Sequence, residues 1–240
     1  MNGIVVAETL RRNLTSVPYI CYVALLAIIA FGISNFDKPA AVWPSLISLL
    51  AYIIGCAPIG PEFSSGTLQL ILTKPVNRSI YLLSRVAGVV GAVWVATLIG
   101  LAVELTGRAA QGGALQFNLM GAALVHSLAG TILICSLLVF FGSFTRAYFN
   151  IAIYVVLMVG VGVLQGLLGF IRQTSTIAGE WLRSHTILDR ILATIEKNLF
   201  PDRPVLFDWH WVLMVLSNAA IALVIACFIF RKREVPYGAD

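Results

Sequence analysis

Few residue types in this sequence have the side chains and the spacing that catalysis requires. Its 240 residues include three histidines and four lysines, and no lysine stands in the Gly-x-x-x-x-Gly-Lys-Ser/Thr loop that holds the phosphates of ATP. The metalloprotease pattern His-Glu-x-x-His and the nucleophile pattern Gly-x-Ser-x-Gly are also absent. The four cysteines stand far apart, with no zinc-binding spacing and no disulfide framework. The sequence therefore predicts a protein that is not an enzyme by itself and has no cofactor of its own.

The composition explains why so few polar side chains are present. Hydrophobic residues make up 59% of the chain and charged residues 11%, which excludes a water-soluble domain. Six intervals of 18 to 37 residues contain no charge at all, and a helix needs about 20 apolar residues to cross a bilayer. We therefore expect an all-α polytopic membrane protein, with residues 1–240 in one transmembrane domain. The six predicted spans are residues 17–34, 42–60, 86–105, 119–142, 148–170 and 209–230.

The distribution of charge predicts the orientation of these spans. Six spans place both termini on one side, and that side carries nine basic residues against four acidic ones. Because basic loops stay in the cytoplasm, we expect both termini in the cytoplasm and the protein in the inner membrane. Residues 1–16 have apolar side chains at helical spacing and are expected to form an interfacial helix, or an extension of the first span. A cleavable signal peptide is a further alternative for the first apolar run.

Two ionisable residues fall within or beside the predicted spans. Glu104 lies near the outer end of the third span, and His126 lies within the fourth. The amides of Asn118, Gln165 and Asn218 share this depth or its margin. Because a charge inside a bilayer is costly, Glu104 and His126 either contact a substrate or make hydrogen bonds between helices.

The loop after the fifth span, residues 171–208, is the longest stretch between predicted spans. Its apolar residues from Leu188 to Leu199 keep the helical period, and Pro201 ends the pattern. We expect an amphipathic helix at the outer surface of the bilayer. It serves either as a structural lid or as a gate for the substrate.

The segment between the second and third spans, residues 62–78, has the most specific pattern in the chain. Prolines precede it, and Pro75 ends a short helix within it. Leu68, Ile71 and Leu72 form an apolar stripe that so small a cytoplasmic face cannot bury. Since so short a helix is marginal alone, it packs either on lipid or on a partner protein.

This segment resembles the signature of the permease subunits of ATP-binding-cassette (ABC) transporters in the type-two exporter family. The residues that carry the resemblance, before a long apolar helix, are Glu62, Gly66-Thr67-Leu68, Leu72 and Pro75-Val76-Asn77-Arg78. Residues 230–238 resemble the usual ending of that family, and the layout agrees over the whole chain. The outer loop is longer than in the simplest members.

The resemblance implies a half-channel that dimerises with a second permease copy or a homologue. It also implies a cytoplasmic ABC ATPase dimer that binds ATP and Mg²⁺, with the short helix as the coupling element. The implied contacts with the ATPase are Glu62, Gly66, Thr67, Leu68, Leu72, Pro75 and Arg78. Arg146, between the fourth and fifth spans, is either a further contact or a residue that sets the topology.

Gly162-x-x-x-Gly166 in the fifth span lets another helix approach closely. That helix belongs either to the second subunit, as the resemblance implies, or to the same chain. The lipid bilayer is an expected partner and nucleic acid is not. The residues that line the translocation path, the substrate and the direction of transport stay open.

An ion-driven secondary carrier and a membrane-embedded enzyme are the alternative functions. A carrier would need buried carboxylates near the midplane and usually an internal repeat, and the sequence shows neither. An enzyme could bind haem between His126 and His210, which both approach the outer side.

Overall fold

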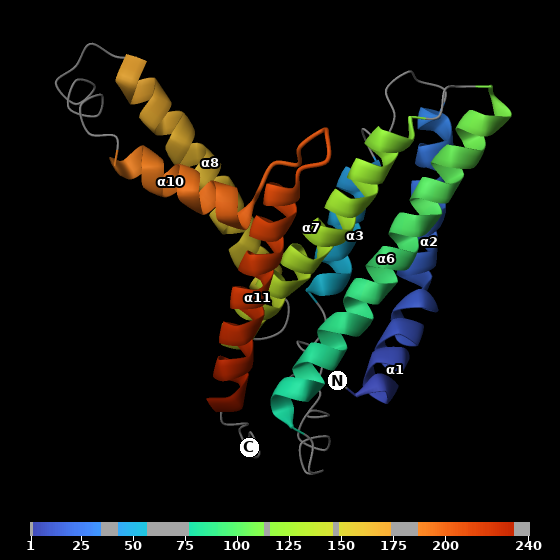
Figure 1. The fold of residues 1–240 in the computed structure, drawn as a ribbon. Helices are drawn as coiled ribbons and strands as arrows, with labels where there is room; N and C mark the ends of the chain where they lie inside the picture. The colour runs from blue at the N-terminus through green and yellow to red at the C-terminus, as the bar shows by residue number, and fades with distance from the viewer. Residues whose placement is uncertain are drawn as a thin grey trace.

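A computed structural model describes residues 2–34, 43–56, 77–112, 116–145, 149–173 and 187–232, and its regular structure there is helical throughout. Figure 1 shows eight helices: α1 (Gly3–Leu14), α2 (Val17–Ile33), α3 (Trp43–Gly55), α6 (Arg78–Ala110), α7 (Phe117–Phe144), α8 (Phe149–Gln173), α10 (Ile187–Leu199) and α11 (Trp209–Lys232). The prediction of an all-α protein is confirmed over these residues.

Four of the described helices, α6, α7, α8 and α11, are long and apolar enough to cross a bilayer. Helices α1 and α2 are bent by 65° at their junction and pass the same test only together, while α3 is an apolar helix of 13 residues. The described residues thus form four candidate spans, or five with the bent pair, and the expected arrangement of six spans is not confirmed. The predicted span 42–60 is the reason, since α3 covers only residues 43–55 of it and residues 57–60 lie outside the described ranges.

Helix α6 is much longer than the predicted span 86–105. It has 33 residues, which makes it about 50 Å long against about 30 Å for the hydrocarbon core of a bilayer. The side chain of Asn77 caps its start and accepts a hydrogen bond from the Ser79 N–H at 3.1 Å. Charged residues end the apolar part of a span but not the helix, so Arg78 lies in the first turn of α6.

The first and last helices reach the same end of the molecule. Figure 1 shows the start of α1, the start of α6 and the end of α11 together there. This end carries Arg78, Arg231 and Lys232, and we call it the basic end. We call the opposite end, where α6 ends and α7 begins, the far end. Which side of the membrane each end faces stays a prediction.

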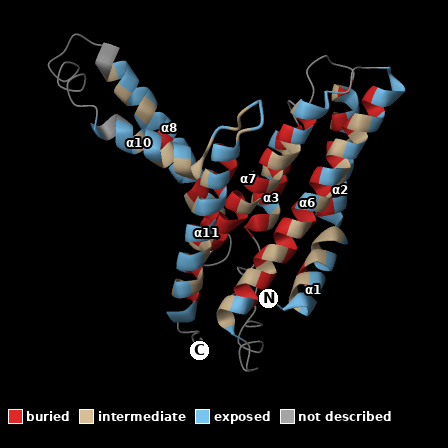
Figure 2. Cartoon of the chain, in the orientation of Figure 1, coloured by how far each residue is buried: buried red, intermediate tan, exposed pale blue. Residues whose placement is uncertain are grey.

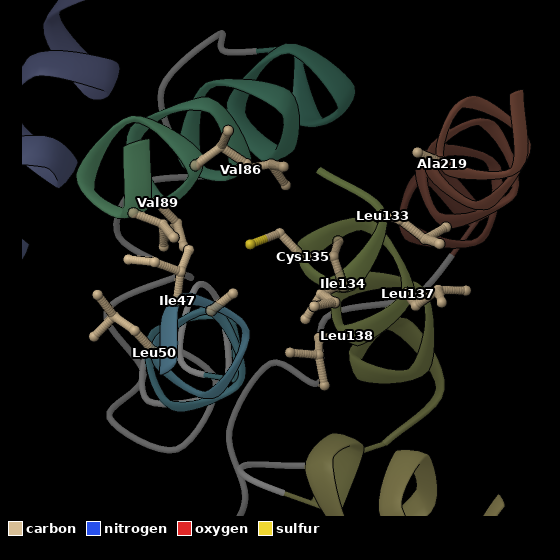
Figure 3. Packing of buried hydrophobic residues seen from close by; sticks show 14 of the residues in the cluster. Ile47, Leu50, Val86, Val89, Leu133, Ile134, Cys135, Leu137, Leu138 and Ala219 are labelled. Atoms are coloured by element: carbon tan, nitrogen blue, oxygen red, sulfur yellow. The ribbon is translucent and has the colours of Figure 1, made fainter. Parts of the chain in front are cut away.

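The core lies where α6 and α7 pack against α2, α3 and α11. Figure 3 shows Cys135 and Leu138 of α7 directed toward the space between α3 and α6. A Cβ built on Gly55 of α3 would stand 3.0 Å from Leu138 Cδ1, so α3 and α7 are in close contact. In Figure 2, α8 and α10 extend away from this core with mostly exposed or half-exposed surfaces.

Glycines allow α1 and α2 to lie directly against α6. A Cβ built on Gly88 would stand 2.6 Å from Thr9 Cβ of α1, and one built on Gly107 would stand 2.8 Å from Ser34 Cβ at the end of α2. Polar contacts reinforce the first approach, because Arg85 Nη1 donates to Thr9 Oγ1 at 3.1 Å. Helix α1 therefore packs on α6 at Gly88, and the end of α2 packs on it at Gly107.

Replacing Gly88 with valine tests this packing. The new side chain would overlap Thr9 and the Val6 carbonyl, and overpacking of this kind costs about 1 to 3 kcal/mol. We expect the midpoint of thermal unfolding of the purified protein to fall. Gly121→Val on α7 is the matched control, because no described atom lies within 4 Å of a Cβ built there. An equal loss of stability in both variants would contradict the close contact.

Candidate functional site

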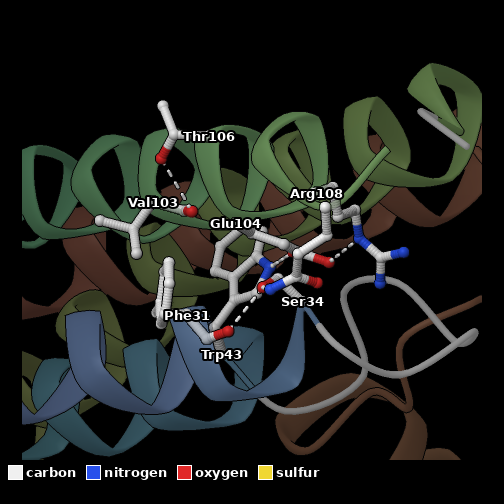
Figure 4. Close-up of polar contacts among 8 residues, drawn as sticks. Phe31, Ser34, Trp43, Val103, Glu104, Thr106 and Arg108 are labelled. Carbon is white, nitrogen blue, oxygen red and sulfur yellow. Dashed lines mark hydrogen bonds and ion pairs between the residues drawn. The ribbon is translucent and has the colours of Figure 1, made fainter. Parts of the chain in front are cut away.

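The polar residues inside the bundle are joined to one another, and the first group lies at the far end. Glu104 Oε2 accepts a hydrogen bond from Trp43 Nε1 at 2.5 Å, and Glu104 Oε1 pairs with Arg108 Nε at 3.1 Å (Figure 4). Glu104 is fully buried and Arg108 is 4% exposed. A buried carboxylate is tolerated when it is paired and hydrogen-bonded, so this group locks α3 to α6.

The end of α2 joins the same group. Ser34, in contact with Gly107, accepts a hydrogen bond from Gln111 Nε2 at 3.2 Å and donates one to the Phe31 carbonyl at 2.5 Å. The far ends of α2, α3 and α6 are therefore held together by side chains. Of the two roles weighed for Glu104, the structure supports the bond between helices.

His126 contacts the loop that precedes α11. The backbone N–H of Asp208 donates to His126 Nε2 at 3.4 Å, and the imidazole is stacked on Phe207 with ring centroids 6.0 Å apart. Its edge contact with Trp211 has a centroid distance of 4.8 Å. His126 is 1% exposed, whereas His210 is exposed at the start of α11. In this state, then, His126 anchors a loop.

Two of the amides within the predicted spans hold α10 in place. Gln165 Nε2 of α8 donates to Glu196 Oε2 at 2.6 Å, and Asn218 Nδ2 of α11 donates to the carbonyl of Asn198 at 3.2 Å. The amphipathic helix expected within residues 171–208 exists as α10, and it is bound to two apolar helices through side chains at membrane depth. Asn118 is exposed in the first turn of α7.

Asn150 forms a similar junction near the end of α7. Its Nδ2 donates to the carbonyls of Cys56, just after α3, and of Leu138 on α7, both at 3.1 Å. Asn150 itself belongs to the first turn of α8 and is 2% exposed. One amide thus joins the consecutive helices α7 and α8 to the residue after α3, which is 94 positions away.

Most residues predicted to contact the ATPase lie outside the described ranges: Glu62, Gly66, Thr67, Leu68, Leu72, Pro75 and Arg146. Arg78 is described and begins α6 at the basic end. Among the described residues, a Cβ built on Gly162 or Gly166 would meet no atom within 4 Å. Within the described residues, then, neither glycine packs against another helix of the same chain.

Several residues that join the helices carry no local signal in the sequence. Trp43 was not singled out, because its partner Glu104 can be identified only once α3 and α6 lie side by side. Arg108 was missed although it stands four residues after Glu104 on the same helix, a spacing that favours an ion pair. Asn150 was missed as well, although an amide in a charge-free interval is the same signal that marked Gln165 and Asn218.

The chain as a whole can now be compared with known families. Residues 7–235 match the family model described as ABC-2 family transporter protein. This chain belongs to that family. No curated protein matches it.

Membership fixes the class of this ABC-2 transporter protein. It is a multi-pass membrane component of an ABC transporter, which confirms the family that the sequence resembles. Within the described ranges, no three histidine, cysteine or acidic side chains form a group able to hold a metal ion. The buried polar groups described above serve to position helices.

Removal of the charges tests the ion pair between Glu104 and Arg108 in this ABC-2 transporter protein. Glu104→Gln keeps an oxygen for the Trp43 indole but removes the charge that faces a buried guanidinium, and we expect a loss of about 3 kcal/mol in stability. Adding Arg108→Met removes the second charge and should recover most of that loss. Unfolding of the purified proteins in detergent measures both effects. Equal destabilisation in the single and double variants would contradict a buried ion pair.

Proposed function

We propose that this chain is the transmembrane permease subunit of an ATP-driven exporter, and that it forms the translocation path as a dimer with a copy of itself or a homologue. The observation that carries this proposal is the match to the ABC-2 transporter family over residues 7–235 in a sequence without a nucleotide-binding loop. ATP and Mg²⁺ then bind to a separate cytoplasmic ATPase dimer, which supplies the free energy for transport.

The residues on either side of the predicted coupling segment support this assignment. Cys56 directly follows α3, and its carbonyl accepts a hydrogen bond from the Asn150 side chain. The next described helix, α6, begins at Arg78. Near that point α1 packs on α6, and the Asn2 N–H donates to Ser84 Oγ at 2.9 Å. A rigid-body movement imposed on residues 62–78 would therefore reach α3, α7 and α8 at one side and α1 and α6 at the other.

We assign the basic end to the cytoplasm and the protein to the inner membrane. Arg78, Arg231 and Lys232 lie at this end, and positive residues beside spans are retained on the cytoplasmic side. Both termini are then cytoplasmic, with α2 and α3 completing six crossings. The ATPase meets this end through Glu62, Gly66 and neighbouring residues, and through Arg146 between α7 and α8.

Replacing Leu68 with aspartate tests ATPase docking. A charge in the apolar stripe should weaken the contact, so we expect less ATPase to co-purify with the chain and ATP hydrolysis to become uncoupled from transport. Gly66→Trp should act in the same way, because its bulky side chain would block close approach of the ATPase to this segment.

The matched control for this charge is Gln116→Asp, because Gln116 is exposed just before α7 at the far end. The control should retain the wild-type amount of ATPase. Normal co-purification and coupled hydrolysis in both Leu68→Asp and Gly66→Trp would contradict the proposed docking segment.

Helix α8 is our candidate for the contact between two permeases. The face that carries Gly162 and Gly166 is apolar and open in the described part of the chain. The exposed side chains of α8 include Val155, Val156, Val159, Val163, Leu164 and Leu167, of which Val155 and Val159 fall on the same face as Gly162 and Gly166. Small residues that let backbones approach drive helix association in lipid, so this face suits a second subunit.

Cysteine crosslinking tests this contact in a chain whose four native cysteines are replaced by alanine. Val163→Cys should give a covalent dimer on mild oxidation in membranes. Val224→Cys on α11 is the control, because Val224 is also largely exposed but lies on another helix. A dimer from Val224→Cys alone, or from neither position, would contradict the assignment of α8.

A further inference from the structure

The loop between α10 and α11 carries a basic side chain toward the core. Arg203 Nη2 donates a hydrogen bond to Ser48 Oγ on α3. The same side chain faces α7, since a Cβ built on Gly130 would stand 3.9 Å from both Nε and Nη2 of Arg203. The side chain of Arg203 thus lies beside both α3 and α7.

Among the described residues, no carboxylate forms an ion pair with Arg203. A guanidinium has five N–H donors, and the bond to Ser48 is the one hydrogen bond that Arg203 makes with the described residues. Its sequence neighbour Asp202 is exposed. Burial removes water from the guanidinium and so lowers the pKa of Arg203. An anion placed here would gain charge-assisted hydrogen bonds that the described residues do not supply.

Arg203 lines a cavity of about 150 Å³ whose other lining residues are mostly apolar and include four aromatic side chains. Tyr52 and Tyr154 line it with their hydroxyls 3.1 Å apart, and Phe200 packs edge-on against Tyr154. Trp211 also lines it, is 8% exposed, and its indole N–H has no hydrogen-bond partner in the described part of the chain. A mostly apolar wall with a few convergent polar groups is the usual form of a small-molecule site.

The cavity reaches the exposed face of α8. Met158 lines the cavity and is also 52% exposed on that helix. A volume of this size holds a head group and a few carbons, since a cavity of about 150 Å³ holds one benzene. A longer apolar chain would therefore pass Met158 and lie along α8.

A neighbouring cavity gives a contrast. It has a volume of about 240 Å³ and shares Phe200 and Trp211 with the first, but Glu196, Lys197 and Asp202 line it together. Charges of both signs there leave no net attraction for an anion. Arg203 is the charged residue among those that line the first cavity.

We propose that the Arg203 cavity binds the head group of a single-chain anionic amphiphile, a carboxylate or phosphate on an acyl or alkyl chain. The guanidinium fork holds two oxygens of the head group, the aromatic walls enclose the first carbons, and the rest of the chain leaves past Met158. The site depends neither on the direction of transport nor on coupling to the ATPase.

Equilibrium binding to the full chain in phosphatidylcholine nanodiscs tests the site, with binding to empty nanodiscs subtracted. We expect laurate and dodecyl phosphate to bind saturably, at one molecule per chain, and to compete with each other. Dodecanol has the same chain length without the charge, and its affinity should be lower by a factor of roughly ten or more. Inorganic phosphate should not displace either amphiphile at equal concentration.

Variants assign the binding to the cavity. Arg203→Gln should lower the affinity for laurate roughly tenfold or more, and Arg203→Lys should have an intermediate affinity because it keeps the charge without the fork. Arg190→Gln is the matched control, since it removes an exposed positive charge from α10. Gly130→Leu keeps Arg203 and fills the cavity, so it should lower the affinity as well.

The proposal would be overturned by unchanged laurate binding in Arg203→Gln and Gly130→Leu, by equal weakening in Arg190→Gln, or by equally strong binding of dodecanol. Displacement of laurate by inorganic phosphate as effective as by dodecyl phosphate would indicate a site for free anions and would also overturn it. Size-exclusion elution reports whether each variant folds. Should Arg203→Gln fail to fold, the comparison of laurate with dodecanol and the Gly130→Leu variant decide the outcome.

Discussion

A polar group inside a bilayer must find its partner within the protein, and the arrangement of these helices depends on that constraint. Lipid tails are as apolar as the side chains of the helices, so apolar contact alone gives little preference for one neighbour over another. An unsatisfied polar group in hydrocarbon costs several kcal/mol. Trp43 with Glu104 joins α3 to α6, Asn150 joins α8 to α7 and to the residue after α3, and Gln165 joins α8 to α10. These pairings select neighbours, and close backbone contacts such as that at Gly88 then complete the packing.

The apolar helices could be predicted from sequence because the thickness of a bilayer sets their length. The predicted spans 119–142, 148–170 and 209–230 agree with α7, α8 and α11 to within a few residues, and the amphipathic period located α10. The ends of α6 could not be predicted in this way, because a helix continues through charges such as Arg108 once it leaves the lipid. Hydropathy measures solubility in lipid, whereas the backbone hydrogen bonds that define a helix do not depend on it.

The sequence could predict that polar residues within the spans make hydrogen bonds, but it could not predict their partners. The ionisable Glu104 and His126 were identified from their depth, and both make hydrogen bonds, but Trp43 is 61 positions away from Glu104 and His126 is bonded to a loop. No spacing rule reaches so far along a chain. The small-residue motif shows the same limit. Gly88 and Gly107, two of the glycines that make close approaches between the described helices, are 19 positions apart, whereas Gly162 and Gly166 face open space there.

Arg203 has no carboxylate partner among the described residues, and its position gives that charge a consequence. The walls around it belong to α3, α7, α8, α10 and α11 and to the loop after α10, and α8 is also the helix with the open apolar face. A molecule that contacts Arg203, Tyr52 of α3 and Met158 of α8 would bind with different affinities in any two arrangements of α8 relative to α3. Linkage makes such coupling reciprocal. Occupancy of the cavity would therefore favour one arrangement of α8, and a partner that binds α8 would change the affinity of the cavity.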